Sequence, residues 1–350
     1  MQKKKYIIDK ATKFINKMKL ISATLLLLVL LSPCLQPTEA QIGVCYGRLG
    51  DNLPDPDQVV HLYKSNGIAN MRIYDPNPHV LQALRGSNIG LIVDVSRTDL
   101  RSLGSDPSAA NRWVQNNIVP YASNVNFRYI AVGNEIMPGD AEEESILPAM
   151  QNVQNALQSA NLAGKIKVST AVIYSIVSGF PPSKGVFTSS SYMNPIVNFL
   201  RNNGSPLLAN IYPYFSYIYT PSIPLDYALC NSTDVQVMDG NLEYRNLFDA
   251  MFDTVYVALA NAGAPNMPIV VSESGWPSDG DTGANFENAG TYYRSLIGHV
   301  KRGTPRNNQA IEAYLFAMFD ENQKIGAQVE RNFGVFTHDQ LSKYQLNFNN

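Results

Sequence analysis

The chain has 350 residues, of which 45% are hydrophobic and 16% are charged, a composition typical of globular proteins and unlike disordered or collagen-like chains. The formal net charge of −2 is unevenly distributed, because the first 40 residues carry seven lysines and only two acidic residues. Without them the chain has 20 basic and 27 acidic residues, a net charge of −7, which argues against partners such as nucleic acid or an anionic membrane.

The first 40 residues predict a secretory signal peptide. Lys17 and Lys19 precede a leucine-rich run, Leu25–Leu31, that is too short to span a bilayer. Thr38–Ala40 then places small residues at positions −3 and −1 of a cleavage site. The basic leader is long, so Met18 is an alternative start. A signal anchor that is never cleaved is the other interpretation, but the well-placed cleavage site favours a secreted protein with a mature part covering 41–350.

Two cysteines remain in this mature part, Cys45 and Cys230. An oxidising compartment permits a disulfide, but Cys45 stands inside an apolar strand pattern, which favours a buried free thiol. The sequence leaves the pairing open. Asn203 and Asn231 each begin an Asn-x-Ser/Thr sequon in a polar stretch, so both are candidate glycosylation sites in a secreted protein.

The mature sequence alternates between short apolar strands and amphipathic helices. The strand patterns are runs of apolar residues closed by turn residues, as expected for strands buried on both faces. We expect eight strands, over residues 42–47, 70–75, 89–95, 127–135, 166–173, 207–212, 268–273 and 311–319. Helical patterns follow nearly every strand, over residues 57–66, 78–84, 107–114, 142–163, 192–202, 247–259 and 286–300.

Eight strand–helix units predict an α/β fold with a single domain, the (β/α)8 TIM barrel, because parallel neighbours require crossover helices. No Gly-x-Gly-x-x-Gly turn follows the first strand and no Gly-Lys-Ser/Thr phosphate loop occurs, which argues against an open nucleotide-binding sheet. The C-terminal strand ends of a barrel build its active face. The candidate functional residues therefore lie where the predicted strands end.

The residues at these strand ends are acidic and aromatic. None of the four histidines ends a strand, so a Ser-His-Asp triad lacks its base, and no His-Glu-x-x-His segment or cysteine pair predicts a zinc site. Carboxylates without histidine or metal ligands favour hydrolysis of an acetal bond, with no metal and no cofactor. The strand-end residues are Tyr74, Asp75, Asp94, Asn134, Glu135, Asn210, Tyr212, Glu273, Asp320 and Glu321.

Two glutamates are the leading catalytic candidates, Glu135 after the fourth strand and Glu273 at the end of the seventh. Either alone could cap a helix or pair with an arginine, since a carboxylate at the end of a buried strand is costly unless solvated, paired or used. Two of them on one active face favour a catalytic pair. Tyr74, Tyr212 and Trp276 are equally well explained as packing residues and as sugar-binding residues.

Six segments match a known family pattern: Ile42–Gly47, Met71–Asp75, Ala131–Glu135, Asn210–Phe215, Val271–Pro277 and Phe316–Lys324. Together they resemble the plant β-1,3-glucanases of glycoside hydrolase family 17. The resemblance covers essentially all of 41–350 in order, and the motifs at Glu135 and Glu273 are the most specific. It implies a (β/α)8 endo-glucanase that retains anomeric configuration and acts on 1,3-β-glucans such as callose, laminarin or fungal wall glucan.

The resemblance also implies roles for single residues. Glu135 matches the general acid/base, Glu273 the nucleophile, and Asn134 the residue that bonds the sugar 2-hydroxyl. Since two nearby carboxylates cannot both ionise cheaply, we expect separated pKa values, with that of Glu135 raised. Candidate subsite residues in cleft-lining segments are Tyr74, Tyr212, Tyr214, Phe215 and Trp276.

Three further charged residues, Glu321, Lys324 and Glu330, match residues that the family keeps around the nucleophile. We interpret them as electrostatic and orienting support, with Lys324 helping to keep Glu273 ionised. The sequence stops soon after Tyr344–Phe348, without the extension of vacuolar members, which favours the extracellular space and cell wall.

Two alternative functions stay open. The 1,3;1,4-β-glucanases share this family, and the motifs do not separate the two linkage specificities. A cell-wall glucan-binding protein without turnover is the other alternative, although the presence of both glutamates argues against it. In each case the expected partner is a β-glucan polysaccharide, and the default assembly is a monomer.

Overall fold

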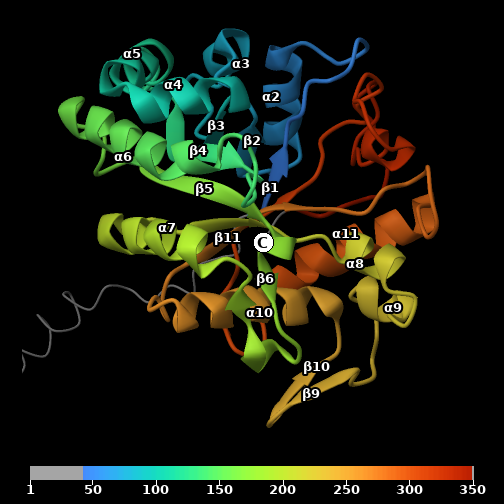
Figure 1. Cartoon of the computed structure of the whole chain (residues 1–350). Coiled ribbons are helices and arrows are strands. Elements are labelled where there is room, and N and C mark those ends of the chain that lie inside the picture. The colour runs from blue at the N-terminus through green and yellow to red at the C-terminus, as the bar shows by residue number, and fades with distance from the viewer. Residues whose placement is uncertain (1–41, 349–350) are drawn as a thin grey trace, which may run out of the picture. The chain divides into compact units, whose positions relative to one another are not determined.

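The computed structural model describes residues 42–348; the predicted signal peptide lies outside this range. Eight parallel strands form a closed barrel in the order β1-β12-β11-β8-β5-β4-β3-β2 (Figure 1). The predicted single-domain α/β barrel is thereby confirmed. Its strands are β1 (Ile42–Cys45), β2 (Asn70–Ile73), β3 (Gly90–Val95), β4 (Asn126–Asn134), β5 (Lys167–Ile173), β8 (Leu207–Asn210), β11 (Ile269–Ser274) and β12 (Ala313–Leu315).

Helices connect successive barrel strands, as parallel pairing requires, and surround the barrel in Figure 1. Two small antiparallel ribbons stand in the loops, β6 (Val177–Ser178) with β7 (Val186–Phe187) and β9 (Val237–Asp239) with β10 (Leu242–Tyr244). Within residues 42–348, no helix has the length and apolar character needed to cross a bilayer. The α-helices are α2 (Pro56–Ser65), α3 (Pro78–Ala83), α4 (Leu100–Ser105), α5 (Pro107–Asn117), α6 (Glu143–Ser159), α7 (Ser190–Asn203), α8 (Pro213–Tyr219), α9 (Leu225–Ala228), α10 (Leu247–Asn261) and α11 (Phe286–Val300).

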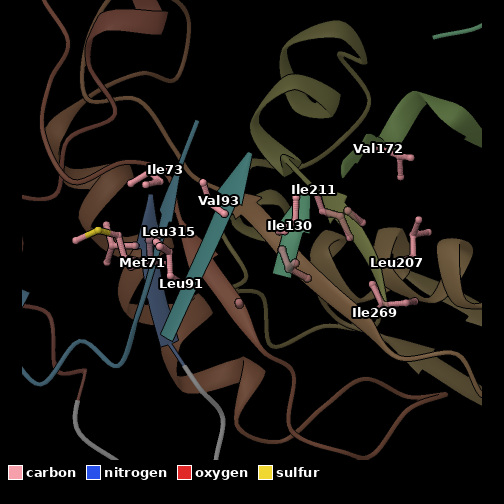
Figure 2. Packing of buried hydrophobic residues seen from close by; sticks show 14 of the residues in the cluster. Met71, Ile73, Leu91, Val93, Ile130, Val172, Leu207, Ile211, Ile269 and Leu315 are labelled. Carbon is pink, nitrogen blue, oxygen red and sulfur yellow. The ribbon is translucent and has the colours of Figure 1, made fainter. Parts of the chain in front are cut away.

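Side chains of the barrel strands alternate between two separate cores. Figure 2 shows Met71 and Ile73 of β2 and Leu91 and Val93 of β3 in the layer between the barrel and its helices. The residue between the first two, Arg72, points the other way, into the barrel, because successive strand residues face opposite sides. The interior cluster itself is apolar and comprises Cys45, Ile92, Ala131, Ala171, Leu208, Val270, Tyr314, Phe316, Ala317 and Phe333.

The segment after β8 is helical, whereas the sequence predicted a strand continuing to Tyr212. The strand ends at Asn210, and Tyr212 precedes Pro213, the first residue of α8. Proline is well tolerated at the first helical position, and it has no backbone N–H to extend a strand ladder.

The eighth barrel strand is shorter than expected, covering Ala313–Leu315 instead of residues 311–319. Beyond it the backbone amides bond to different neighbours in turn. The amide of Phe316 donates to the carbonyl of Ser274 on β11, and that of Met318 donates to the carbonyl of Cys45 on β1. The segment still closes the barrel, but it does not keep the regular pairing of a strand.

Both described cysteines are free, as expected for Cys45. The two sequons differ in their surroundings. Asn231 is exposed, whereas Asn203 is half-buried as the last residue of α7. The side-chain amide of Asn203 donates to the carbonyl of Phe199 at 2.8 Å, so this asparagine is engaged in ending its own helix.

Candidate active site

A cleft of about 1020 Å³ opens where the barrel strands end. In a (β/α)8 barrel this is the face on which active sites are built. Both Glu135 and Glu273 line the cleft. Nine more of the candidate residues line it as well: Tyr74, Asp75, Asn134, Asn210, Tyr212, Phe215, Glu321, Lys324 and Glu330.

Glu135 directly follows β4 and has an unusual backbone conformation. Its φ is 56°, in the left-handed region, and Gly133 nearby has a φ of 89°. The register of β4 against β5 shifts between Ala131 and Asn134, which marks a bulge. Consecutive side chains of a regular strand point to opposite faces, whereas here both Asn134 and Glu135 reach the cleft. The irregular strand end thus places two adjacent residues in the same site.

Glu273, on β11, is only 6% exposed and accepts three hydrogen bonds. Arg72 Nη1 and the Tyr74 hydroxyl donate to Oε1, at 2.9 and 2.8 Å, and the Tyr212 hydroxyl donates to Oε2 at 2.7 Å. Burial, with a contribution from the charge of Glu273, raises the pKa of both phenols, so they stay protonated donors. Three donors therefore fix the position of this carboxylate.

Arg72 is a site residue that the sequence analysis did not include. It is fully buried and bonds Asp94 through two nitrogens, Nε to Oδ1 at 3.1 Å and Nη2 to Oδ2 at 2.7 Å. Burial lowers the pKa of Arg72, but the negative charges of Asp94 and Glu273 raise it by more than burial lowers it. The net shift of the pKa is upward, so the guanidinium is charged. The sequence signal was an arginine at an inward-facing position between two apolar, outward-facing neighbours.

Two asparagines connect this arginine to Glu135. Asn134 Oδ1 accepts from Arg72 Nη2 at 2.9 Å and from Asn210 Nδ2 at 3.0 Å. With its oxygen engaged in this way, the amide nitrogen of Asn134 is the group that can donate into the cleft. Asn210 Nδ2 also donates to Glu135 Oε1 at 2.9 Å. Hydrogen bonds thus run from Glu273 through Arg72 and the asparagines to Glu135.

The two glutamates differ in their electrostatic surroundings. Burial raises the pKa of Glu135 to about 7, and the negative charge of Glu273 adds to the shift, while Asn210 and Arg72 oppose it. The direction agrees with the expectation from the sequence. A carboxyl with this pKa is protonated in a large fraction of molecules near neutral pH, as a general acid must be.

The charged residues Glu321, Lys324 and Glu330 lie in the same cleft. Lys324 Nζ bonds Glu330 Oε2 at 3.0 Å, and the cation that bonds Glu273 is Arg72. Burial raises the pKa of Glu321. Arg72 thus contacts Glu273 directly from the barrel interior, while the electrostatic support expected from Lys324 stays a prediction.

Tyr214 and Trp276 are fully buried, and the prediction that they line the cleft is corrected. Their rings pack edge to face with centroids 5.1 Å apart, and Trp276 Nε1 donates to the carbonyl of Gly283 at 2.9 Å. Phe215, next to Tyr214 on α8, does line the cleft, because adjacent helical residues point about 100° apart. The two buried rings support the loops of the active face from inside.

Phe316 and Phe333 also line the cleft, and the sequence analysis did not include them as site residues. Both rings pack edge to face against Tyr212, with centroid distances of 6.2 and 6.0 Å. Phe316 lies in a segment that carried the family resemblance, so its position could have been found. Phe333 stands in a late loop without a local pattern that would reveal it.

The site therefore combines a buried and a half-buried carboxyl, an arginine, amide donors and aromatic rings. In the part of the chain from 42 to 348, no three His, Cys, Asp or Glu side chains gather as a metal-ligand group. Two carboxyls in an aromatic cleft suit glycoside hydrolysis, where one protonates the leaving oxygen and the other acts at the anomeric carbon.

Comparison with known proteins agrees with this chemistry. The chain matches Glycosyl hydrolases family 17 over residues 42–348. It is 60% identical to a glucan endo-1,3-beta-glucosidase of Vitis vinifera over 314 residues, which cover 88% of this chain and 91% of the relative. It is 55% identical to the acidic isoform of a glucan endo-1,3-beta-glucosidase of Zea mays over 315 residues, 89% of this chain and 93% of the relative.

Solved structures give the same result. The fold is similar to that of CJP38, a beta-1,3-glucanase and allergen of Cryptomeria japonica pollen, with a TM-score of 0.86 and 48% identity over 88% of this chain and 99% of that one. It is also similar to one of two plant beta-glucan endohydrolases described as having distinct substrate specificities, with a TM-score of 0.84 and 46% identity over 87% and 99% of the two chains. The chain belongs to family 17 of the glycosyl hydrolases.

Proposed function

We propose that this protein is an endo-1,3-β-glucanase that hydrolyses 1,3-β-glucans with retention of anomeric configuration. The contrast between the two cleft carboxyls carries the proposal. Glu273 is held by three donors, including the buried guanidinium of Arg72, whereas Glu135 is half-buried and the loss of solvation raises its pKa to about 7. Such a contrast suits a nucleophile and a general acid. The relatives named as glucan endo-1,3-beta-glucosidases support the choice of substrate.

The reaction proceeds by double displacement. A carboxylate oxygen of Glu273 attacks the anomeric carbon while Glu135 gives its proton to the glycosidic oxygen, so the bond to the leaving sugar breaks and a glycosyl ester forms. Glu135, now ionised, then takes a proton from water, and the water oxygen replaces Glu273 at the anomeric carbon. Two inversions restore the original configuration. The free amide nitrogen of Asn134 donates to the sugar 2-hydroxyl.

The cleft supports action within a polysaccharide chain. Its volume of about 1020 Å³ is at the upper end of ordinary small-molecule sites, and it leaves room for several sugar units. Tyr74, Tyr212 and Phe215, which are half-buried, supply aromatic surface along it, on which the C–H faces of sugar rings stack. Phe316 and Phe333 are buried and support these rings from behind. The three half-buried rings are proposed as substrate-binding residues.

The proposal includes a secreted protein. Residues 1–40, or 18–40 if translation starts at Met18, form a cleaved signal peptide, and the catalytic domain covers 41–350. The family match, which begins at residue 42, supports this boundary. The mature chain acts in the extracellular space or cell wall as a monomer without a cofactor.

A substrate panel tests the activity. We expect the protein to release reducing sugar from laminarin, a 1,3-β-glucan, and to be much slower on lichenan, a 1,3;1,4-β-glucan. The Glu273→Gln variant, which keeps the shape but not the charge of the nucleophile, is the control and should be inactive on both.

Each outcome of the panel has one meaning. A preference for lichenan would favour the 1,3;1,4-β-glucanase alternative. Silence of the wild type on both substrates, with binding intact, would identify a glucan-binding protein. Full activity of Glu273→Gln would remove Glu273 as the nucleophile.

A further inference from the structure

Asn210, the last residue of β8, is fully buried at the base of the cleft and connects both halves of the proposed catalytic pair. Its Oδ1 accepts from Arg72 Nη1 at 3.1 Å and from the Ser272 hydroxyl at 2.8 Å. Its Nδ2 donates to Glu135 Oε1 at 2.9 Å and to Asn134 Oδ1 at 3.0 Å. The two acceptor and two donor positions of the side chain are thus all used inside the protein.

The neighbours decide which way this amide faces. The guanidinium of Arg72 can only donate, so the oxygen of Asn210 must face it and the nitrogen must face Glu135. The Ser272 hydroxyl, on β11, donates to the same oxygen. A reversed amide would place N–H groups against the guanidinium and an oxygen against the Glu135 carboxyl. Arg72, which also bonds Glu273, therefore orients the donor that reaches Glu135.

We propose that Asn210 is a positioning residue for the acid/base, whose amide, oriented by Arg72 and Ser272, holds Glu135 in place for proton transfer. The inference rests on the proposed function of Glu135. Asn210 acts through Glu135, because it is fully buried and engaged with protein groups. The same hydrogen bond favours the ionised form of Glu135 and opposes the burial that raises its pKa.

A comparison of leaving groups tests the proposal. A dinitrophenol leaves without protonation, so a variant that misplaces the acid should lose kcat/KM on a laminari-oligosaccharide far more than on a 2,4-dinitrophenyl β-laminaribioside. For Asn210→Ala we expect a loss of about 10- to 100-fold on the oligosaccharide, because general acid catalysis as a whole contributes about 10²–10⁴-fold. On the activated substrate we expect a change of about threefold or less.

Asn210→Asp is a second variant, which keeps the proposal testable if Asn210→Ala does not fold. It is nearly isosteric and keeps the acceptor for Arg72 and Ser272, but it replaces the donor to Glu135 with an oxygen. Both variants should move the basic limb of kcat/KM on the oligosaccharide to higher pH, by about one unit, because a hydrogen bond to the charged form of Glu135 is lost.

Asn246→Ala is the matched control, since Asn246 is also buried and hydrogen-bonded, to Asp249 on α10. It should leave unchanged both the ratio of the kcat/KM values on the two substrates and the basic limb of the pH dependence, whatever its effect on Tm. Equal losses on both substrates with an unmoved limb in the Asn210 variants would overturn the inference.

Glu135→Ala separates this inference from the proposed function. If Glu135→Ala shows the loss confined to the poor leaving group while the Asn210 variants do not, the inference alone fails. If Glu135→Ala loses activity equally on both substrates, the acid/base assignment itself fails and the inference fails with it.

Discussion

At the scale of single residues, the site places one residue type in two different surroundings. Glu135 and Glu273 are chemically the same, but Glu273 accepts bonds from a cation and two phenols while burial dominates at Glu135. Their positions at strand ends were predictable from the sequence. The bond to Arg72 was not, because it joins residues 201 positions apart and no local pattern records such a contact.

The raised pKa of Glu135 predicts a basic limb near pH 7 in the pH dependence of kcat/KM. The carboxyl has to be protonated to act as an acid, so activity falls as the pH rises through about 7. The measurement is kcat/KM on a laminari-oligosaccharide across the acidic and neutral range. A basic limb near 4.5, the usual value of this group, would show that burial does not tune Glu135.

The contacts of Arg72 predict a large effect on folding stability. Arg72→Met leaves the buried carboxylates of Asp94 and Glu273 without their cation, and breaking a buried pair in this way costs about 3–5 kcal/mol in the free energy of unfolding. Arg97→Met is the matched control, since Arg97 is 58% exposed and its pair with Glu142 contributes about 0–1 kcal/mol. Urea unfolding measures both. Similar small losses in the two variants would contradict the role given to Arg72.

At the scale of elements, the bulge at the end of β4 is the feature that assembles the site. The sequence predicted the strand and its terminal glutamate. The regular alternation of side chains along a strand would, however, place Asn134 and Glu135 on opposite faces. The bulge depends on pairing with β5, a contact between distant segments, so it could not be read from the motif. The helix α8 was missed for a different reason, since its 7 residues are too few to show a helical period.

Gly133 is the residue that permits this bulge. It has a φ of 89°, and an added Cβ would lie 2.7 Å from Ile146 Cδ1. Gly133→Ala should therefore lower the free energy of unfolding by about 1–2 kcal/mol and displace Glu135, with a loss of kcat/KM of up to about 100-fold.

Gly139→Ala provides the comparison, because Gly139 has a φ of 94° but no atom within 4 Å of an added Cβ. It should show a similar loss of stability with nearly full activity. Thermal unfolding and kcat/KM of both variants are the measurements. Full activity of Gly133→Ala would show that the bulge does not position the acid.

At the scale of the whole molecule, the alternation of strand and helix patterns along the sequence was enough to predict the barrel. Eight buried strands with crossover helices admit few closed arrangements, so the architecture followed from periodicity. The small ribbons β6–β7 and β9–β10 were not predicted, because their strands span only two or three residues and depend on contacts within the loops. The buried rings of Tyr214 and Trp276 were misplaced because an aromatic residue near a strand end suits either packing or binding.

Secretion, which is part of the proposal, leads to a prediction about the two sequons. Asn231 is exposed, whereas the half-buried Asn203 bonds the carbonyl of Phe199 at the end of α7. We expect a glycan on Asn231, so Asn231→Gln should abolish the mobility shift caused by endoglycosidase treatment of the secreted protein. Asn203→Gln should leave that shift intact, and the opposite pattern would contradict the assignment.

The configuration of the first product tests the central claim most directly. Proton NMR during the first minutes of laminari-oligosaccharide hydrolysis, before mutarotation, distinguishes the α- and β-anomers of the new reducing end. Double displacement by Glu273 and Glu135 predicts that the β-anomer forms first and the α-anomer grows in later. Initial release of the α-anomer would mean a single displacement by water and would contradict Glu273 as the nucleophile.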